Sequence, residues 1–214
     1  MTFKHHNEPG SALTHLIGAA TSVAALVLMV VFAAINGGAS HVVGASIFGA
    51  SLILLYLSST IFHAIAKNHP QRPFWQSMDH SMIFVLIAGT YTPMTLNFPH
   101  AGWGWSLFGA VWGLAILGIV LELTMRRAHM ITIPLYLIMG WMIAIPWQYL
   151  EQYLGSEGLF WLFIGGLSYT IGVIFYMLDS KVTRTKWFGM HEIFHIFVLG
   201  GSFAHFWLVL NFLY

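Results

Sequence analysis

Long apolar stretches alternate with short polar breaks along the whole chain. Seven of these stretches come near the roughly 20 residues that a helix needs to cross a bilayer. They cover approximately residues 14–35, 42–66, 78–97, 102–125, 131–149, 158–178 and 190–213. The breaks contain turn residues, as in Asn36-Gly37-Gly38, Asn68-His69-Pro70, Asn97-Phe98-Pro99 and Gly155 to Gly158. This pattern predicts an all-α membrane protein, a bundle of seven transmembrane helices.

The first apolar stretch is long enough to remain in the membrane as a helix. It runs for about twenty residues, from Leu16 to Ile35. The apolar region of a cleavable signal peptide is shorter and ends at a small-residue cleavage site. We therefore expect a retained first helix after a short N-terminal segment, residues 1–13. The breaks leave no room for a second domain, so residues 1–214 are expected to form one membrane domain.

The composition favours a surface that faces lipid. Charged residues make up 7% of the chain and apolar residues 58%, whereas an ordinary soluble domain is about 25% charged. The aromatic content of 16%, with nine Trp, suits the interfacial belts of membrane helices. The chain has no Cys, so a metal site would need His and carboxylate ligands. The few, scattered basic residues exclude a nucleic-acid-binding surface.

The basic residues predict the orientation of the helices. All eight fall on one side of the seven-helix pattern, and the charged residues of the opposite loops are Glu151 and Glu157. The eight are Lys4, Lys67, Arg72, Arg126, Arg127, Lys181, Arg184 and Lys186. Because basic loops stay in the cytoplasm, we expect the N-terminus inside and the C-terminus outside. The expected location is the inner (plasma) membrane, crossed several times.

Ionisable side chains gather at the predicted cytoplasmic ends of three helices. His63 ends the second helix and Asp79 begins the third, while the seventh begins with His191 and His195. Such groups are costly in a membrane and indicate function. Four-residue spacing puts His191 and His195 on one face, as it does Ser59 and His63. Three imidazoles and a water form the catalytic type of zinc site, and Ser59 and Asp79 could hold that water.

A second interpretation of these histidines needs no metal. A single His near a helix end commonly hydrogen-bonds to a carbonyl or a lipid headgroup. A pair at four-residue spacing also arises easily by chance in a chain with twelve His. The convergence of three helices at one depth favours the metal site.

The segment from His191 to His195 also reads H-E-x-x-H. In soluble zinc proteases this pattern places two His on the metal and a Glu, here Glu192, as general base. An intramembrane protease would need a third ligand, usually an Asp from a later helix, but the ionisable residue that follows His195 is His205. The pattern therefore favours zinc more than it favours proteolysis.

Other polar and small residues are expected to have structural roles. His15 could cap the first helix or approach the site, and we favour a structural role. His205 lies about 15 Å along the helix from His195 at 1.5 Å per residue, too far for the same ion. It is expected to form an interhelical hydrogen bond or part of a polar path into the bundle. The Gly109–Gly113 pair is expected to allow close helix packing, with dimerisation as an alternative.

Two acidic residues have basic neighbours in the sequence. Glu122 is followed four residues later by Arg126, and Asp179 two residues later by Lys181. Pairs at four-residue spacing are surface contacts worth a few tenths of a kcal/mol at most. We expect both acidic residues to form contacts of this kind.

Four stretches together resemble the bacterial haemolysin III proteins of the progestin and adipoQ receptor (PAQR) family. They are Glu8 to Gly18, Ser58 to His63, Asp79 to Pro93 and His191 to His205. The resemblance covers essentially the full length. It implies a seven-helix bundle with its N-terminus inside and a zinc ion bound by three histidines, with Ser59 and Asp79 around the metal-bound water. The implied ligands are His63, His191 and His195.

The chain departs from the family pattern at Ser11, where the first motif usually has Asn. The residue after the first His of the seventh helix also varies in the wider family, which argues against Glu192 as an obligatory base.

The leading functional hypothesis is a zinc-dependent hydrolase of lipid amides or esters at the inner leaflet, with Asp79 as the base. A zinc ion lowers the pKa of its bound water to about 7 and polarises a carbonyl. The wider superfamily that the chain resembles includes alkaline ceramidases, an analogy of fold.

The alternative is a non-enzymatic regulator of membrane lipids, or a receptor-like protein, with a structural zinc. A pore-forming haemolysin is the third hypothesis, disfavoured because a resident multi-pass protein does not readily leave its bilayer. Membrane lipids are the expected partners in either leading case.

Overall fold

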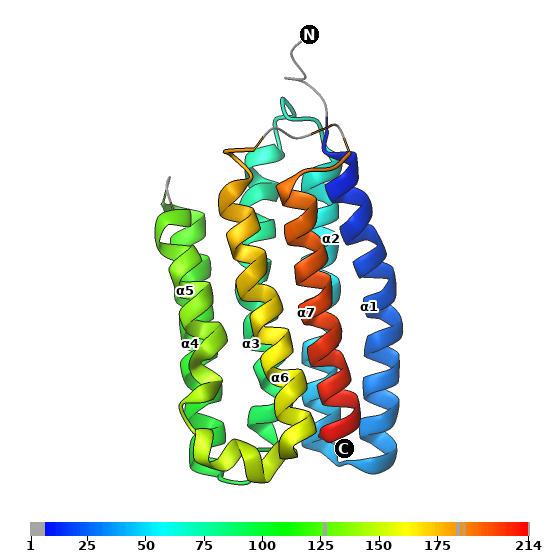
Figure 1. Cartoon of the computed structure of the whole chain (residues 1–214), viewed down its shortest axis with the longest axis vertical. Coiled ribbons are helices and arrows are strands. Elements are labelled where there is room, and N and C mark those ends of the chain that lie inside the picture. Colours follow the sequence, from blue (N-terminus) through cyan, green and yellow to red (C-terminus); the bar gives the residue numbers. More distant parts are fainter. Residues whose placement is uncertain (1–6, 126–127, 183–184, 186, 214) are drawn as a thin grey trace.

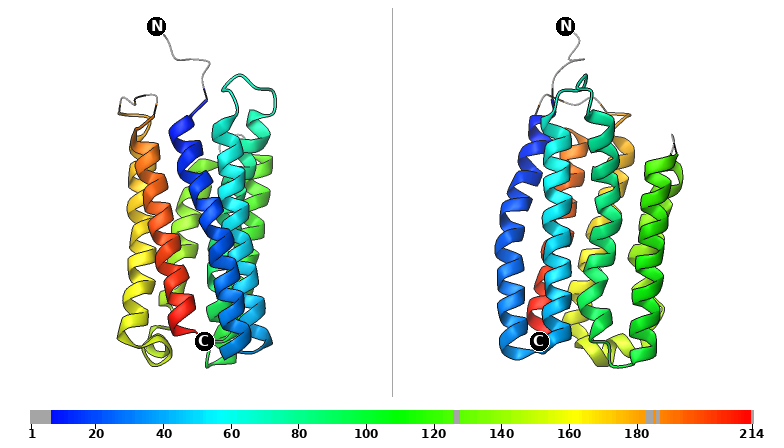
Figure 2. Two further views of the ribbon diagram at one scale, coloured as in Figure 1. Left: turned by 90° about the vertical axis from the view of Figure 1, so that its right-hand side faces the viewer. Right: turned by 180° about the vertical axis from the view of Figure 1, so that it is seen from behind.

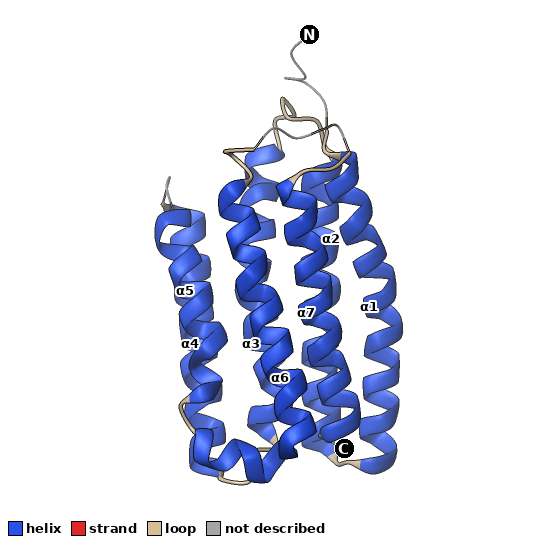
Figure 3. Ribbon diagram, viewed as in Figure 1, coloured by secondary structure: helices blue, strands red, loops and turns tan. Residues whose placement is uncertain are grey.

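The computed structural model describes residues 7–125, 128–182, 185 and 187–213, which form an all-helical bundle (Figure 1). The helices are α1 (Pro9–Asn36), α2 (Ala39–Ala64), α3 (Arg72–Leu96), α4 (Ala101–Thr124), α5 (His129–Trp141), α6 (Trp147–Leu178) and α7 (Met190–Phe212). A short 3₁₀ turn, η1 (Met142–Ala144), extends α5. No strand occurs among these residues (Figure 3). The prediction of a seven-helix bundle is confirmed.

The helices have the length and surface of membrane-spanning segments. Five of the described helices, α1, α2, α4, α6 and α7, are long and apolar enough to cross a bilayer. Large apolar side chains are exposed on the outside of the bundle, whereas Ser, Thr and His side chains are buried within it. The 25-residue α3 is as long as its neighbours but less apolar, because its first turns carry Arg72, Asp79 and His80. The exposed apolar side chains agree with a lipid-facing exterior, while the interior combines an apolar core with buried polar groups.

All the parts that carry candidate ligands meet at one end of the bundle. The beginnings of α1, α3 and α7 and the end of α2 lie together there, at the top of Figure 1, and the two turned views agree (Figure 2). We call this the N-terminal end. Lys67, Arg72 and Lys181 belong to segments at this end, while Glu151 and Glu157 lie on α6 near the opposite end. The remaining basic residues lie outside the described part of the chain: Lys4, Arg126, Arg127, Arg184 and Lys186. Which end faces the cytoplasm stays a prediction.

The connection between α5 and α6 differs from the predicted one. The fifth helix was expected to reach residue 149, but α5 ends at Trp141 and is followed by η1. The Tyr91 hydroxyl of α3 donates to the carbonyl of Met139 at 2.7 Å and accepts from the backbone N–H of Ile143 at 2.8 Å. It thus satisfies backbone groups that the helix break leaves free. The predicted break at Gly155 is present as a kink within α6, with φ of 63°.

Two glycines let α4 pack closely against α3, and they are not the pair that was predicted. A Cβ atom at Gly104 would overlap the carbonyl oxygen of Thr95, and one at Gly118 would overlap the ring of Phe84. A Cβ at Gly109 or Gly113 would meet nothing within 4 Å. The prediction that Gly109–Gly113 allows close helix packing is therefore wrong within this bundle. The two glycines lie on a part of α4 that no neighbouring helix approaches.

We expect Gly104→Ala to lower the free energy of unfolding by about 1–3 kcal/mol, because the backbone oxygen of Thr95 cannot move aside as a side chain could. Gly113→Ala is the matched control on the same helix. It should be neutral, or stabilising by up to about 1 kcal/mol through helix propensity. Denaturant titration of both variants in micelles measures the difference. A comparable loss in Gly113→Ala would contradict the prediction and indicate that this face packs against a second copy of the chain.

Candidate metal centre

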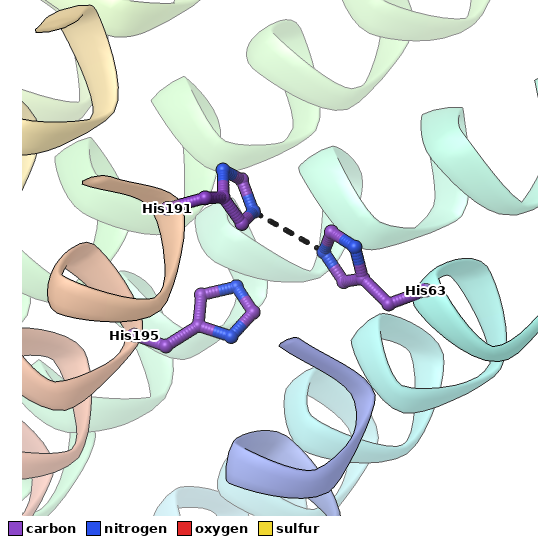
Figure 4. A group of neighbouring side chains, drawn as sticks. All are labelled: His63, His191 and His195. Atoms are coloured by element: carbon purple, nitrogen blue, oxygen red, sulfur yellow. Dashed lines mark hydrogen bonds between the residues drawn. The ribbon is translucent and has the colours of Figure 1, made fainter. Parts of the chain in front are cut away.

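Three histidines from two helices converge at the N-terminal end of the bundle (Figure 4). His63 lies in the last turn of α2, and His191 and His195 lie in the first two turns of α7. One ring nitrogen from each falls within 4.8 Å of the other two. His63 and His195 are almost fully buried, and His191 is partly buried. The structure thus brings together the three predicted ligands.

The spacing of the two facing ring nitrogens suits a tetrahedral metal. The Nε2 atoms of His63 and His191 are 3.2 Å apart. Two nitrogens bound to one tetrahedral zinc at about 2.0–2.1 Å would be about 3.3 Å apart. The donor set is also one that catalytic zinc sites use: three imidazoles, which can bind as neutral ligands, and no thiolate. The donor set therefore fits a zinc ion; its three nitrogens, within 4.8 Å of one another, would draw closer on binding.

Ser59 and Asp79 lie beside this cluster, as predicted. Ser59 is buried one turn before His63 on α2. The carboxyl of Asp79 lies near enough to the Ser59 hydroxyl and to the His63 ring to interact with both. All five residues named from the sequence therefore lie in one region, contributed by α2, α3 and α7.

The start of α1 contacts the histidine cluster, which was not predicted from the sequence. Glu8, Ser11 and Thr14 recur every third residue and face the cluster. The Glu8 Oε2 atom lies 2.9 Å from His63 Nδ1, and Thr14 Oγ1 lies 2.9 Å from His195 Nδ1. Ser11 donates its hydroxyl to the carboxylate of Glu192. The signal in the sequence was the three-residue spacing of polar side chains at the start of an apolar helix.

Glu8 is bound from several sides. Its carboxylate contacts Arg72 at 2.8 Å and Lys67 at 3.1 Å, in addition to His63. Its backbone N–H donates to the carbonyl of His63 at 3.0 Å. Burial acts to raise the pKa of Glu8, but the hydrogen bond and charge of His63, together with Lys67, outweigh it and lower the pKa well below its usual value. With Arg72 and Lys67 against it, the Glu8 carboxylate is placed as a hydrogen-bond acceptor.

Glu192 faces α1, away from the position that the H-E-x-x-H pattern suggested. Its side chain is 1% exposed and accepts the hydrogen bond of Ser11. A residue next to His191 on a helix projects about 100° away from it. The geometry therefore gives Glu192 an interhelical contact between α7 and α1, at the position where the family pattern has Asn in place of Ser11.

Two further residues near the cluster contact its histidines. The buried ring of His15 stacks on that of His195 with centroids 3.5 Å apart, and neither of its nitrogens has a hydrogen-bond partner. Asp179, predicted beside Lys181, accepts the backbone N–H of His191 at 3.1 Å and lies 3.8 Å from His191 Nδ1. His15 thus approaches the site, the less favoured of the two roles considered for it.

Two other residues lie differently from what the sequence predicted. Glu122 does not make a surface contact: its buried carboxylate lies 2.8 Å from Nδ1 of His80 on α3. The residue expected as its partner, Arg126, lies outside the described residues. His205 pairs its Nδ1 with the carbonyl of Gly201 in its own helix at 2.9 Å, and the described residues show no hydrogen bond from it to another helix; its predicted part in a polar path stays a prediction. Its ring instead stacks against Tyr169 of α6.

The fold and the cluster define a multi-pass helical membrane protein with a three-histidine site near one end of the bundle. The chain belongs to the haemolysin III family: the family described as "Haemolysin-III related" matches residues 3–206. It is 41% identical to the Hemolysin-3 homolog of Bacillus subtilis, over 97% of this chain and 95% of that protein. It is 39% identical to Hemolysin-3 of Bacillus cereus, over 95% and 90%. A more distant relative is the human monocyte to macrophage differentiation factor, 28% identical over 78% of this chain and 69% of that protein.

Proposed function

We propose that this chain binds zinc at His63, His191 and His195 and hydrolyses an amide or ester bond of a membrane lipid. The observation that carries the proposal is the convergence of three imidazoles, with the carboxyl of Asp79 nearby. When bound, zinc would polarise the substrate carbonyl and lower the pKa of a bound water to about 7. The basic residues support placement of the site at the cytoplasmic leaflet of the inner (plasma) membrane.

Two residues near the cluster have proposed roles in the reaction. Asp79 is the proposed base, since its carboxyl adjoins the histidine cluster and can accept a proton from the attacking water. Ser59, buried beside that carboxyl, is the proposed residue that holds it in place. The depth of the cluster, at the ends of α2 and α7, corresponds to the level where the carbonyl of an acyl linkage lies in a lipid. Membrane lipids are therefore the proposed substrates.

The test is hydrolysis of a panel of ceramides and lipid esters by the purified chain in lipid nanodiscs. We expect turnover that disappears with a chelator, returns with zinc and falls about 10²–10⁴-fold in Asp79→Asn, the usual effect of losing a general base. Asp79→Asn should still bind zinc, because its side chain is not a proposed ligand. Absence of metal-dependent turnover of any lipid in the panel would overturn the enzymatic proposal.

The second candidate is a non-enzymatic regulator in which zinc is structural. The observation that favours it is that the cluster joins α2 to α7 and is contacted by α1, so a metal would connect three helices. Zinc binding that raises the melting temperature while no lipid is turned over would support this function.

A further inference from the structure

We propose that the first two turns of α1 are part of the metal centre: Glu8 and Thr14 hold the rings of His63 and His195 so that their Nε2 atoms face the ion. The inference rests on the zinc binding of the proposed function. It concerns α1, which contributes no ligand. The three-residue stripe of Glu8, Ser11 and Thr14 is the feature that supports it.

The hydrogen bonds of His63 determine which of its nitrogens carries the proton. The carboxylate of Glu8 is paired with Arg72 at 2.8 Å and with Lys67 at 3.1 Å, so it acts as an acceptor and the Nδ1 of His63 donates to it at 2.9 Å. In the neutral ring the Nε2 atom then carries a lone pair. That lone pair points toward His191 Nε2, 3.2 Å away. Glu8 thus prepares His63 as a ligand through Nε2.

The same reasoning applies to His195. The Thr14 hydroxyl lies 2.8 Å from the carbonyl of Ser11, which can only accept, and 2.9 Å from Nδ1 of His195. We assign its one hydrogen to the Ser11 carbonyl, so that Thr14 accepts from Nδ1 of His195. The neutral ring of His195 then also presents a lone pair at Nε2. Two of the three proposed ligands owe their tautomer to α1.

The stripe is held in place independently of any metal. Arg72 and Lys67 fix the carboxylate of Glu8. A Cβ atom at Gly10 would overlap the carbonyl oxygen of Trp187, so the absence of a side chain there lets α1 approach the segment that precedes α7. His15, one residue after Thr14, stacks on the His195 ring and restricts its rotation. Such pre-orientation of ligands by outer groups typically changes metal affinity 10–100-fold.

The experiment compares the zinc affinity of Glu8→Gln and Thr14→Val with that of the unmodified chain, by competition with a chromophoric chelator in micelles. Each variant is expected to bind zinc about 10–100-fold more weakly. Thr21→Val is the matched control, because Thr21 lies on the same helix and its hydroxyl bonds only to nearby carbonyls of α1. Its affinity should equal that of the unmodified chain.

A second measurement separates orientation of the ligands from general stability. ¹⁵N spectra of the metal-free chain with labelled histidine should show His63 and His195 protonated at Nδ1, and Thr14→Val should change the signal of His195 alone. Unchanged zinc affinity in both variants, or protonation at Nε2 in the unmodified chain, would overturn this inference while zinc binding stood. Failure of the unmodified chain to bind zinc would overturn both the inference and the proposed function.

Discussion

Replacing His195 with alanine is expected to weaken zinc binding by more than 100-fold. The reason is that a first-shell ligand contributes more than the outer groups whose loss costs about 10–100-fold. His195 is 1% exposed and contacts Thr14 and the ring of His15, so it is held in the interior of the bundle. Chelator competition on the purified variant measures the loss. The control is His129→Ala, at an exposed His that begins α5.

The same variant should lose the stabilisation that the metal gives the bundle. A ligand present at 1,000 times its dissociation constant stabilises the folded state by about 4 kcal/mol. Added zinc should therefore raise the melting temperature of the unmodified chain and of His129→Ala, but not that of His195→Ala. A His195→Ala variant that kept both its affinity and its zinc-dependent melting shift would rule out this residue as a ligand.

Replacing Glu122 with leucine is expected to destabilise the bundle by about 3 kcal/mol, near the lower end of the cost of breaking a buried pair. The side chains of Glu122 and His80 are 8% and 17% exposed and lie 2.8 Å apart. Removal of the carboxylate leaves the Nδ1 of His80 without its partner at the interface of α3 and α4. Unfolding in micelles by denaturant measures the change, with Glu151→Gln as the control at an exposed position.

The double variant His80→Leu with Glu122→Leu provides the sharper comparison. Apolar side chains in place of both members leave no unpaired polar group, and such replacements are often neutral or stabilising. The double variant should therefore be more stable than Glu122→Leu alone. If the two single changes were each neutral, the pair would contribute nothing to the packing of α4 on α3.

The helices were predictable because lipid requires each crossing to be long and apolar. The histidine cluster was predictable because its members lie at helix ends, and the order of the helices determines at which side of the membrane each end lies. The end of α5 was not predictable, because it depends on the hydroxyl of Tyr91, 48 residues from the carbonyl that it binds. Glu8 and Thr14 were missed for the same reason: their partners are 55 and 181 residues away. These contacts depend on how each helix is rotated about its axis.

Glu122 shows how a local pattern can mislead. A basic residue four positions away suggested a surface contact, but the carboxylate is buried and contacts His80, 42 residues away, while Arg126 lies outside the described residues. In a membrane the solvent-facing side of a helix is lipid, so an acidic side chain gains more from a polar neighbour inside the bundle.

The course of α7 has a practical consequence for metal measurements. The helix carries His191 and His195 at one end and finishes at Phe212 on the opposite end of the bundle, roughly 25 Å from His195 at 1.5 Å per residue (Figure 2). A polyhistidine purification tag joined after α7 would be separated from the cluster by the width of the bilayer core. The same tag joined ahead of Glu8 would place competing imidazoles beside the site and distort every affinity measured there.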